Sequence, residues 1–378
     1  MMNSDPVHHS YFIVPKEVFL LTKFGFLLHP LDTSDIERKY AFARYLPKSW
    51  VEAALAVMPP QDCGCITGVK SLTGAETEGW FVGCPLTASQ LLHGNPEKCT
   101  RKIVDACNRA ADLGAEVVGL GAFTSVVGDK GITIAERVGI GVTTGNSFTT
   151  ATGIEGTLLA AEKMGIVPAQ AQAAILGATG SIGKIAAKIL APQVGGLTLV
   201  SRRADALQQV IEELGNPPNV KAETDLNAAL READMIIAVT SSVEAIVQPE
   251  HLKPGAVVCD VARPRDVSRR VAEERDDVLV IEGGAVAVPG PVNIGFNFGF
   301  PPGMVYACMA ETMLLALEGR TGDYSLGADL KIEQVEEMAA LGKKHGFKLG
   351  GFRSFERQLS DADVEAVRRR AEAKKSRS

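Results

Sequence analysis

The stretch ILGATGSIGKIAAKIL, residues 175–190, restricts the fold more than any other part of the sequence. An apolar run enters it, three glycines follow at intervals of three, and a segment with helical spacing of apolar residues leaves it. A strand, a tight glycine turn and a helix in this order form the phosphate cradle of dinucleotide-binding domains. A turn that only closes an α/β unit is the alternative. The residues that we expect to hold the dinucleotide here are Gly177, Thr179, Gly180, Ser181, Ile182 and Gly183.

The pattern around this motif predicts an α/β domain from about residue 170 to about residue 290. Short apolar runs alternate there with segments of helical periodicity, which is typical of a Rossmann-like doubly wound parallel sheet. The expected strands are 171–179, 197–203, 235–242, 256–262 and 278–286, and the expected helices are 181–192, 204–215 and 226–234.

The end of the second expected strand favours NADPH over NADH. NAD sites usually place a carboxylate there to bind the ribose 2′-hydroxyl, whereas this chain has Ser201, Arg202 and Arg203 and no carboxylate before Asp205. A hydroxyl and guanidinium groups suit a 2′-phosphate, and an exposed basic turn is the alternative. At the end of the fourth strand, on the expected nicotinamide side of the sheet, lie Thr240 and Ser241.

Length and composition indicate a two-domain enzyme of small or acyl substrates. The chain has 378 residues, of which 46% are hydrophobic, and a formal net charge of −6. General nucleic-acid binding requires a basic surface, so we expect no nucleic-acid partner. Seven scattered cysteines indicate a reducing compartment, and CGC at 63–65 lacks the spacing of a zinc site, so no metal is expected.

The beginning of the chain lacks the basic segment of a signal peptide. No apolar run reaches the roughly 18 residues that a membrane span needs. We therefore expect a cytoplasmic protein that could contact a membrane only peripherally.

The rest of the chain predicts a second, mixed α/β substrate domain beside the nucleotide-binding domain. We expect residues 1–165 to form the N-terminal part of the substrate domain and 166–290 the NADPH-binding domain. Residues 291–378 should supply C-terminal helices that pack with the substrate domain. A glycine- and proline-rich linker there leads into a nearly all-apolar, buried helix over 304–319, and a charged tail, 368–378, is expected to fray.

Cysteines are the candidates for covalent chemistry. No Tyr-x-x-x-Lys follows the glycine motif, and the six histidines have no evident carboxylate partner in the sequence. Cys107 falls in the middle of an expected helix. Cys308 falls some two turns past the expected start of its helix, where the dipole gives little activation. From the residues alone, a cysteine in either place is more often a small core hydrophobe.

A series of stretches, taken in order, resembles the long-chain acyl-carrier-protein reductase family. These stretches are FGFLLHPL (24–31), VKSLTGAETEGWFVGCPL (69–86), LGAFTS (120–125), TTGNSFTT (143–150), GATGSIG (177–183), EGGAV (282–286), ACMAETMLLALEG (307–319) and KHGFKL (344–349). Together they cover roughly residues 24 to 350. The loop at 289–303, richer in glycine and proline than the family's, leaves acyl length and the choice of acyl donor open.

The resemblance implies a reaction and a nucleophile. The cysteine of the family's ACxAE helix carries the acyl group, and Cys308 stands at that position. Its thiolate would attack an acyl thioester of acyl-carrier protein or coenzyme A, and NADPH would then reduce the bound thioester to a fatty aldehyde. An aldehyde-consuming enzyme is a further partner that the resemblance allows. As donors for the developing oxyanion we expect Ser125, Thr144 and Asn146.

Two other readings stay open from the sequence. A shikimate- or quinate-like NADP-dependent dehydrogenase shares the two-domain plan and would need a Lys-Asp pair in the N-terminal domain. A non-catalytic protein that binds NADPH without turnover is the other alternative.

Overall fold

The nucleotide-binding half is built on six parallel strands in the order β11-β10-β9-β6-β7-β8. Numbered from β6, this order reads 3-2-1-4-5-6 across the sheet, which is the order of doubly wound dinucleotide-binding domains. The predicted fold class is therefore confirmed. The strands are β6 (Gln172–Leu176), β7 (Gly196–Val200), β8 (Val220–Glu223), β9 (Met235–Ala238), β10 (Val257–Asp260) and β11 (Leu279–Glu282). The helices between them are α7 (Ser181–Leu190), α8 (Ala204–Glu213), α9 (Leu226–Arg231), η4 (Pro249–His251) and α10 (Arg269–Glu274).

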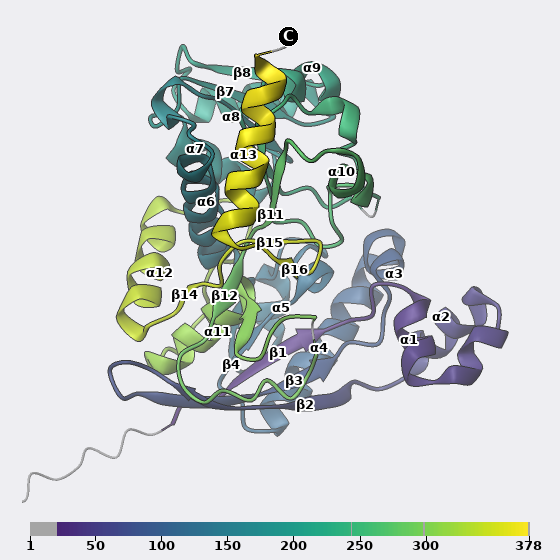
Figure 1. Cartoon of the computed structure of the whole chain (residues 1–378). Helices are drawn as coiled ribbons and strands as arrows, with labels where there is room; N and C mark the ends of the chain where they lie inside the picture. The colour runs from purple at the N-terminus through teal and green to yellow at the C-terminus, as the bar shows by residue number, and fades with distance from the viewer. Residues whose placement is uncertain (1–20, 243, 298, 377–378) are drawn as a thin grey trace, which may run out of the picture.

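The computed structural model describes residues 21–242, 244–297 and 299–376 (Figure 1). It differs from the predicted strands in two places. The strand β8 was not expected, because its sequence VKAE contains no apolar run. In the structure it lies at the edge of the sheet and is partly exposed. The expected strand 278–286 is two strands, because Gly283 and Gly284 interrupt it and Gly284 has a φ of +76°, a value that β-strands do not use. The second piece, β12 (Ala285–Ala287), joins a different sheet.

A second, mixed sheet of order β2-β3-β1-β4-β5 forms the N-terminal half. Its strand β2 is antiparallel to β3, and the other neighbours are parallel. The strands are β1 (Phe24–Leu28), β2 (Gln61–Lys70), β3 (Glu76–Gly83), β4 (Val117–Gly119) and β5 (Gly141–Thr143). The helices of this half are α1 (Thr33–Lys39), η1 (Ala41–Tyr45), α2 (Lys48–Val57), α3 (Ala88–His93), α4 (Pro96–Asp112), η2 (Ala122–Ser125) and α5 (Ile132–Arg137).

Two helices connect the halves. Helix α6 (Asn146–Lys163) follows β5 and packs against β9, β10 and β11 of the nucleotide-binding sheet. Helix α11 (Ala307–Leu317) packs against α6 and against β1, β3 and β4, in the apolar core that contains Phe24 and Phe26. This position explains why α11 is apolar on all sides: a segment from the last quarter of the chain fills the core of the N-terminal sheet.

The remaining elements surround these two helices. Helix α12 (Ile332–His345) lies against α6 and α11, and η3 (Pro168–Gln170) precedes β6. A three-stranded sheet is formed by β12, β13 (Met304–Tyr306) and β14 (Lys348–Leu349), and a hairpin by β15 (Arg353–Ser354) and β16 (Arg357–Gln358).

The charged C-terminal segment is helical, so the expectation of a frayed tail is wrong for its described residues. Helix α13 (Asp361–Lys375) runs along the nucleotide-binding half (Figure 1). Val364 and Ala371 are each 2% exposed and pack in the core of that half, not against the N-terminal sheet. Lys374 also pairs with Asp277 over 3.1 Å. Two apolar residues spaced by seven are enough to attach a helix that otherwise reads as charged.

Within the residues that the structure describes, no helix combines the length and the apolar character that crossing a bilayer requires.

Candidate active site

Cys308 is the second residue of α11, so the expectation that it lies two turns into its helix is wrong. The preceding residues 304–306 form β13, which pairs with β12 through Val305 and Val286. The backbone therefore stays extended through Tyr306, which is the N-cap residue of α11. Cys308 lies in the first helical turn, where free N–H groups and the positive end of the helix dipole favour an anion.

The surroundings of the Cys308 sulfur nevertheless favour the protonated thiol. Burial raises the pKa of this thiol to about 12, and the N–H of Met309 and the charge of Arg263 oppose the shift. Glu311, one turn further along α11, adds to the increase. The helix start alone does not produce a thiolate at neutral pH.

Gly145 packs directly on Cys308. A Cβ atom at position 145 would lie 2.3 Å from both Cα and Cβ of Cys308, and the φ of Gly145 is +74°. Both facts require glycine at this position. The loop between β5 and α6 therefore carries Asn146 and the first N–H groups of α6 close to the sulfur.

Glu311 holds the same loop from behind. Its carboxyl group is fully buried and accepts hydrogen bonds from Oγ1 of Thr143 (2.6 Å) and from the N–H of Phe148 in the first turn of α6 (2.7 Å). Burial raises the pKa of Glu311. Glu311 thus joins β5, α6 and α11 at the point where Cys308 is positioned. The signal for it was present in the sequence, because a carboxylate in an apolar helix is rarely buried without a specific partner.

The glycine turn after β6 has the geometry of a dinucleotide cradle. Gly177 has a φ of +80°, and a Cβ atom there would lie 2.8 Å from the carbonyl oxygen of Val239. A Cβ atom on Gly183 would lie 2.3 Å from the carbonyl oxygen of Gly177. Gly180 is the N-cap of α7 and provides no side-chain cap, so the N–H groups of the first turn are left for a ligand. These residues fit the pyrophosphate of a nicotinamide dinucleotide.

The two arginines after β7 differ in position. Arg202 lines the cavity in front of the cradle, whereas Arg203 is the exposed N-cap residue of α8 and does not. Ser201 also lines the cavity, and its hydroxyl lies 3.2 Å from Oγ1 of Thr179. Both arginines are exposed, and of the two only Arg202 lines the cavity.

The hydroxyl groups expected to act as donors mostly have partners already. Thr144 donates to the carbonyl oxygen of Ser325, and Ser125 donates to the carbonyl oxygen of Ala122 at 2.6 Å. Thr240 donates to Asp266 from its hydroxyl and, at 2.8 Å, from its N–H.

Asn146 and Ser241 stand apart from these hydroxyl groups. Nδ2 of Asn146 donates to Oγ of Ser181 at the start of α7 over 3.2 Å, which links the starts of α6 and α7. Ser241 is exposed and lines the cavity.

One cavity of about 2070 Å³ brings these groups together. It extends from the glycine turn past Cys308 to a lobe made by α1, η1 and α2. Pockets for single drug-sized ligands measure about 300–1,000 Å³, so this cavity has room for a dinucleotide and a second large ligand. The predicted site residues that line it are Ser125, Thr144, Asn146, Gly177, Thr179, Gly180, Ser181, Ile182, Ser201, Arg202, Thr240, Ser241 and Cys308. Gly183 and Arg203 do not line it.

Cys107 lies elsewhere. It is fully buried in α4, and burial raises the pKa of its thiol far above the ordinary value. It does not line the cavity. Its environment is that of an inert core cysteine.

Comparison with known proteins gives three kinds of similarity. The family model of shikimate / quinate 5-dehydrogenase matches residues 159–282, which lie in the nucleotide-binding half. Aminotransferase PigE of Serratia sp. (strain ATCC 39006) is 32% identical over 343 residues, which are 86% of this chain and only 39% of that relative's length. Long-chain acyl-[acyl-carrier-protein] reductase of Synechococcus elongatus is 30% identical over 336 residues, which are 83% of this chain and 94% of that protein. Among solved structures, L-tryptophan dehydrogenase from Nostoc punctiforme aligns with a TM-score of 0.40 and 12% identity over 94% of this chain and 89% of that chain.

Proposed function

This chain belongs to the long-chain acyl-[acyl-carrier-protein] reductase family, and from that premise we propose that it reduces a long-chain fatty acyl thioester to the fatty aldehyde with NADPH. The family and the nucleotide-binding half make the chain an oxidoreductase that uses a nicotinamide cofactor. The acyl donor, acyl-carrier protein or acyl-CoA, and the choice of NADPH are parts of the proposal.

The observation that carries the proposal is that Cys308 and the glycine turn line one cavity. A reductase that forms an acyl-enzyme needs a nucleophile within reach of the reduced cofactor. A cysteine sealed in the core of α11 could not act in this way. Cys308 is instead partly exposed, in the first turn of its helix, whereas its neighbours Ala307 and Met309 are buried.

The first step is a transfer between sulfurs. Sγ of Cys308 attacks the carbonyl carbon of the acyl thioester, and the bond from that carbon to the donor's sulfur breaks. The proton that Cys308 loses ends on the departing thiol, so the step has no net change in charge. One thioester replaces another, and the acyl group is now held in the first turn of α11.

The second step is reduction. The bound nicotinamide cofactor supplies the hydride. The protein holds the acyl carbon at Cys308, and the oxygen that gains negative charge needs hydrogen-bond donors fixed in advance. We assign this role to Nδ2 of Asn146, because Asn146 follows Gly145 in the chain and lines the same cavity as Cys308. Its amide nitrogen carries two N–H groups, of which one donates to Ser181. When the carbon–sulfur bond breaks, the aldehyde leaves and the thiolate of Cys308 takes a proton from water.

The lobe of α1, η1 and α2 suits an alkyl chain. Apolar and aromatic side chains line the cavity there, among them Leu46, Trp50 and Leu55. Phe42 and Trp50 are 65% and 67% exposed although both also line the cavity. These apolar side chains give a long chain contacts away from water, although Asp35 and Arg38 also line this part of the cavity.

The decisive experiment is mass spectrometry of the protein mixed with palmitoyl-CoA, or with palmitoyl-carrier protein, without dinucleotide. We expect a mass increase of one acyl group, mapped to Cys308 and absent in Cys308→Ala. Turnover of NADPH to aldehyde should fall at least about 1,000-fold in Cys308→Ala, since removal of a covalent nucleophile typically has an effect of this order. The matched control is Cys63→Ala, because Cys63 lines the same cavity and is partly exposed.

Other outcomes would identify other functions. Full activity of Cys308→Ala would exclude the acyl-enzyme. Oxidation of a hydroxy acid that resists thiol alkylation would favour a shikimate-like dehydrogenase, and tight NADPH binding without consumption of any acyl thioester would favour a non-catalytic role.

A further inference from the structure

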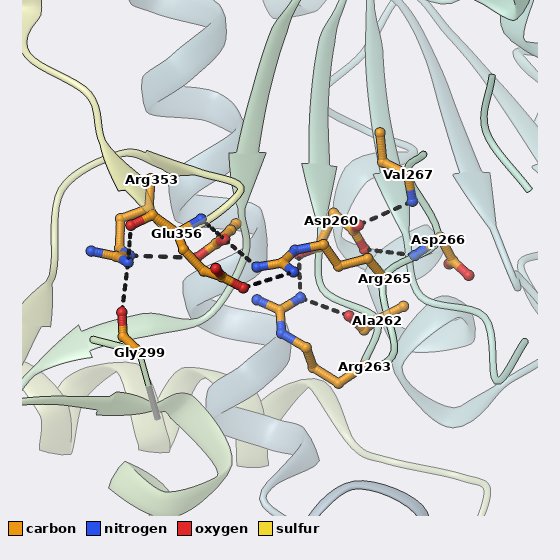
Figure 2. A network of polar contacts seen from close by, with 10 residues as sticks. Asp260, Ala262, Arg263, Arg265, Asp266, Val267, Gly299, Arg353 and Glu356 are labelled. Carbon is orange, nitrogen blue, oxygen red and sulfur yellow. Dashed lines mark hydrogen bonds and ion pairs between the residues drawn. The ribbon is translucent and has the colours of Figure 1, made fainter. Parts of the chain in front are cut away.

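Three arginines lie together at the carboxyl ends of β10 and β11, and one of them is unlike the other two (Figure 2). Arg265 pairs with Glu282 at 2.7 Å and with Glu356 at 3.3 Å. Arg353 pairs with Glu282 at 3.4 Å and donates to the carbonyl oxygen of Gly299 at 3.0 Å. These contacts attach the β15–β16 hairpin and the loop before α11 to the end of β11.

In this network Arg263 donates to main-chain oxygens, and its side chain also hydrogen-bonds the side chain of Tyr306. Its Nη1 donates to the carbonyl oxygens of Ala262 (2.6 Å) and Asp260 (3.4 Å). The Nε atoms of all three arginines are buried without a hydrogen-bond partner, but of the three only Arg263 forms no ion pair with a carboxylate of the described residues. Its charge is therefore not directly neutralised by a carboxylate, although Asp260 and Glu282 favour it electrostatically.

Arg263 faces the reaction cavity beside Cys308. Both residues line that cavity, and Cζ of Arg263 lies 5.3 Å from the ring centre of Tyr306. Tyr306 caps α11 two residues before Cys308. The charge of Arg263 also lowers the pKa of the Cys308 thiol, against the larger effect of burial.

We propose that Arg263 is the counter-ion of the anion that forms at Cys308, first the thiolate and then the oxyanion of the attacked thioester. The inference rests on the proposed function and adds a catalytic residue to it. When Cys308 loses its proton, the guanidinium group of Arg263, which forms no ion pair with a carboxylate of the described residues, gains a negative partner. When the donor's thiol departs with the proton, Cys308 carries a neutral thioester. Arg263 keeps its positive charge.

The other charged groups near this pair do not compete for that role. Glu311 raises the pKa of the thiol and so opposes its ionisation, and burial raises the pKa of Glu311 itself. Asp260 and Glu282 attract Arg263 electrostatically, but the carboxylate oxygens of Asp260 accept from the N–H groups of Asp266 (3.3 Å) and Val267 (3.1 Å). Glu282 is occupied by the two other arginines.

Thiol alkylation tests the proposal independently of any acyl substrate. The rate of carboxamidomethylation of Cys308 by iodoacetamide, followed by peptide mass spectrometry between pH 7 and 10, should fall about tenfold in Arg263→Gln, equivalent to a rise of one pKa unit. Arg263→Lys should stay close to the native rate, and guanidinium ions at millimolar concentration should restore part of the rate in Arg263→Gln. Arg265→Gln is the matched control, because it removes a neighbouring arginine that already has carboxylate partners.

A second measurement uses only the native protein, so it can still be made if Arg263→Gln fails to fold. In the native protein, the rate ratio of anionic iodoacetate to neutral iodoacetamide should be higher at Cys308 than at Cys63, because the charge of Arg263 acts on Cys308. Equal ratios at the two cysteines, or an unchanged rate in folded Arg263→Gln, would overturn the proposal. A slower alkylation in Arg263→Gln together with a higher ratio at Cys308 would support the role of Arg263. If no acyl adduct then forms on Cys308, the proposed substrate is wrong although the role of Arg263 holds.

Discussion

The glycine cradle and the Cys308 site face one cavity but are built in opposite ways. The cradle lies within residues 177–183, and its shape follows from a strand, a turn and a helix that are consecutive in the chain. The Cys308 site takes its parts from the β5–α6 loop, from the start of α11 and from the loop after β10. The first site is encoded locally, whereas the second exists only after distant segments have packed.

This difference predicts how each site responds to change. A substitution in the cradle should act through one turn and its neighbouring strand. A substitution at Cys308's contacts should alter the catalytic step and leave the nucleotide-binding half intact. Three substitutions test the contrast, and they are described from the largest expected effect to the smallest.

Gly145→Ala should lower turnover of acyl thioester by about 100-fold, the effect expected when reacting groups shift by about 1 Å. The new Cβ atom would lie 2.3 Å from Cys308, and the φ of +74° disfavours alanine. NADPH binding, measured by fluorescence titration, should not change. Gly139→Ala is the control, since a Cβ atom there meets nothing within 4 Å. Native turnover in Gly145→Ala would show that the two segments are not held in contact.

Gly183→Ala should act in the other half. A Cβ atom 2.3 Å from the carbonyl oxygen of Gly177 and 2.7 Å from Cα of Ala178 must displace the turn, and overpacking of this kind costs about 1–3 kcal/mol. We expect weaker NADPH binding and a lower midpoint of urea unfolding, with an unchanged rate of Cys308 alkylation. Gly322→Ala, which introduces no contact within 4 Å, controls for loss of backbone freedom. A large change in alkylation would mean that the two sites are coupled.

Arg202→Gln should reduce the preference for NADPH over NADH by about tenfold, which corresponds to about 1.4 kcal/mol. Arg202 lines the cavity, whereas Arg203 lies outside it. Arg203→Gln should therefore leave the preference nearly unchanged. Ratios of kcat/KM for the two cofactors measure the effect, and equal losses in both variants would indicate that only the general basic character of the turn matters.

The sequence was most informative where one element follows another without a partner from elsewhere. Alternating apolar and helical segments predicted the parallel sheet. The prediction missed only β8 and the interruption at Gly283–Gly284. The charged segment after residue 360 was misread because the two buried positions of α13, Val364 and Ala371, are outnumbered by charged neighbours. Two buried positions among charged residues can be recognised only when the core against which they pack is known.

The start of α11 shows the limit most clearly. The run from Met304 to Ala310 is apolar throughout and contains no signal that separates strand from helix. Pairing of β13 with β12 keeps residues 304–306 extended, and the helix then begins at Ala307. This tertiary contact moved Cys308 from the expected interior of a helix to its first turn.

The sequence by itself determined the nucleotide cradle, because glycine spacing and local periodicity act over a few residues. Only the tertiary structure decided that Gly145 lies on Cys308, that Glu311 holds the loop behind it and that Arg263 forms no ion pair with a carboxylate of the described residues. These relations depend on the distances and burial of side chains from separate elements, and those are set when the halves pack around α6 and α11.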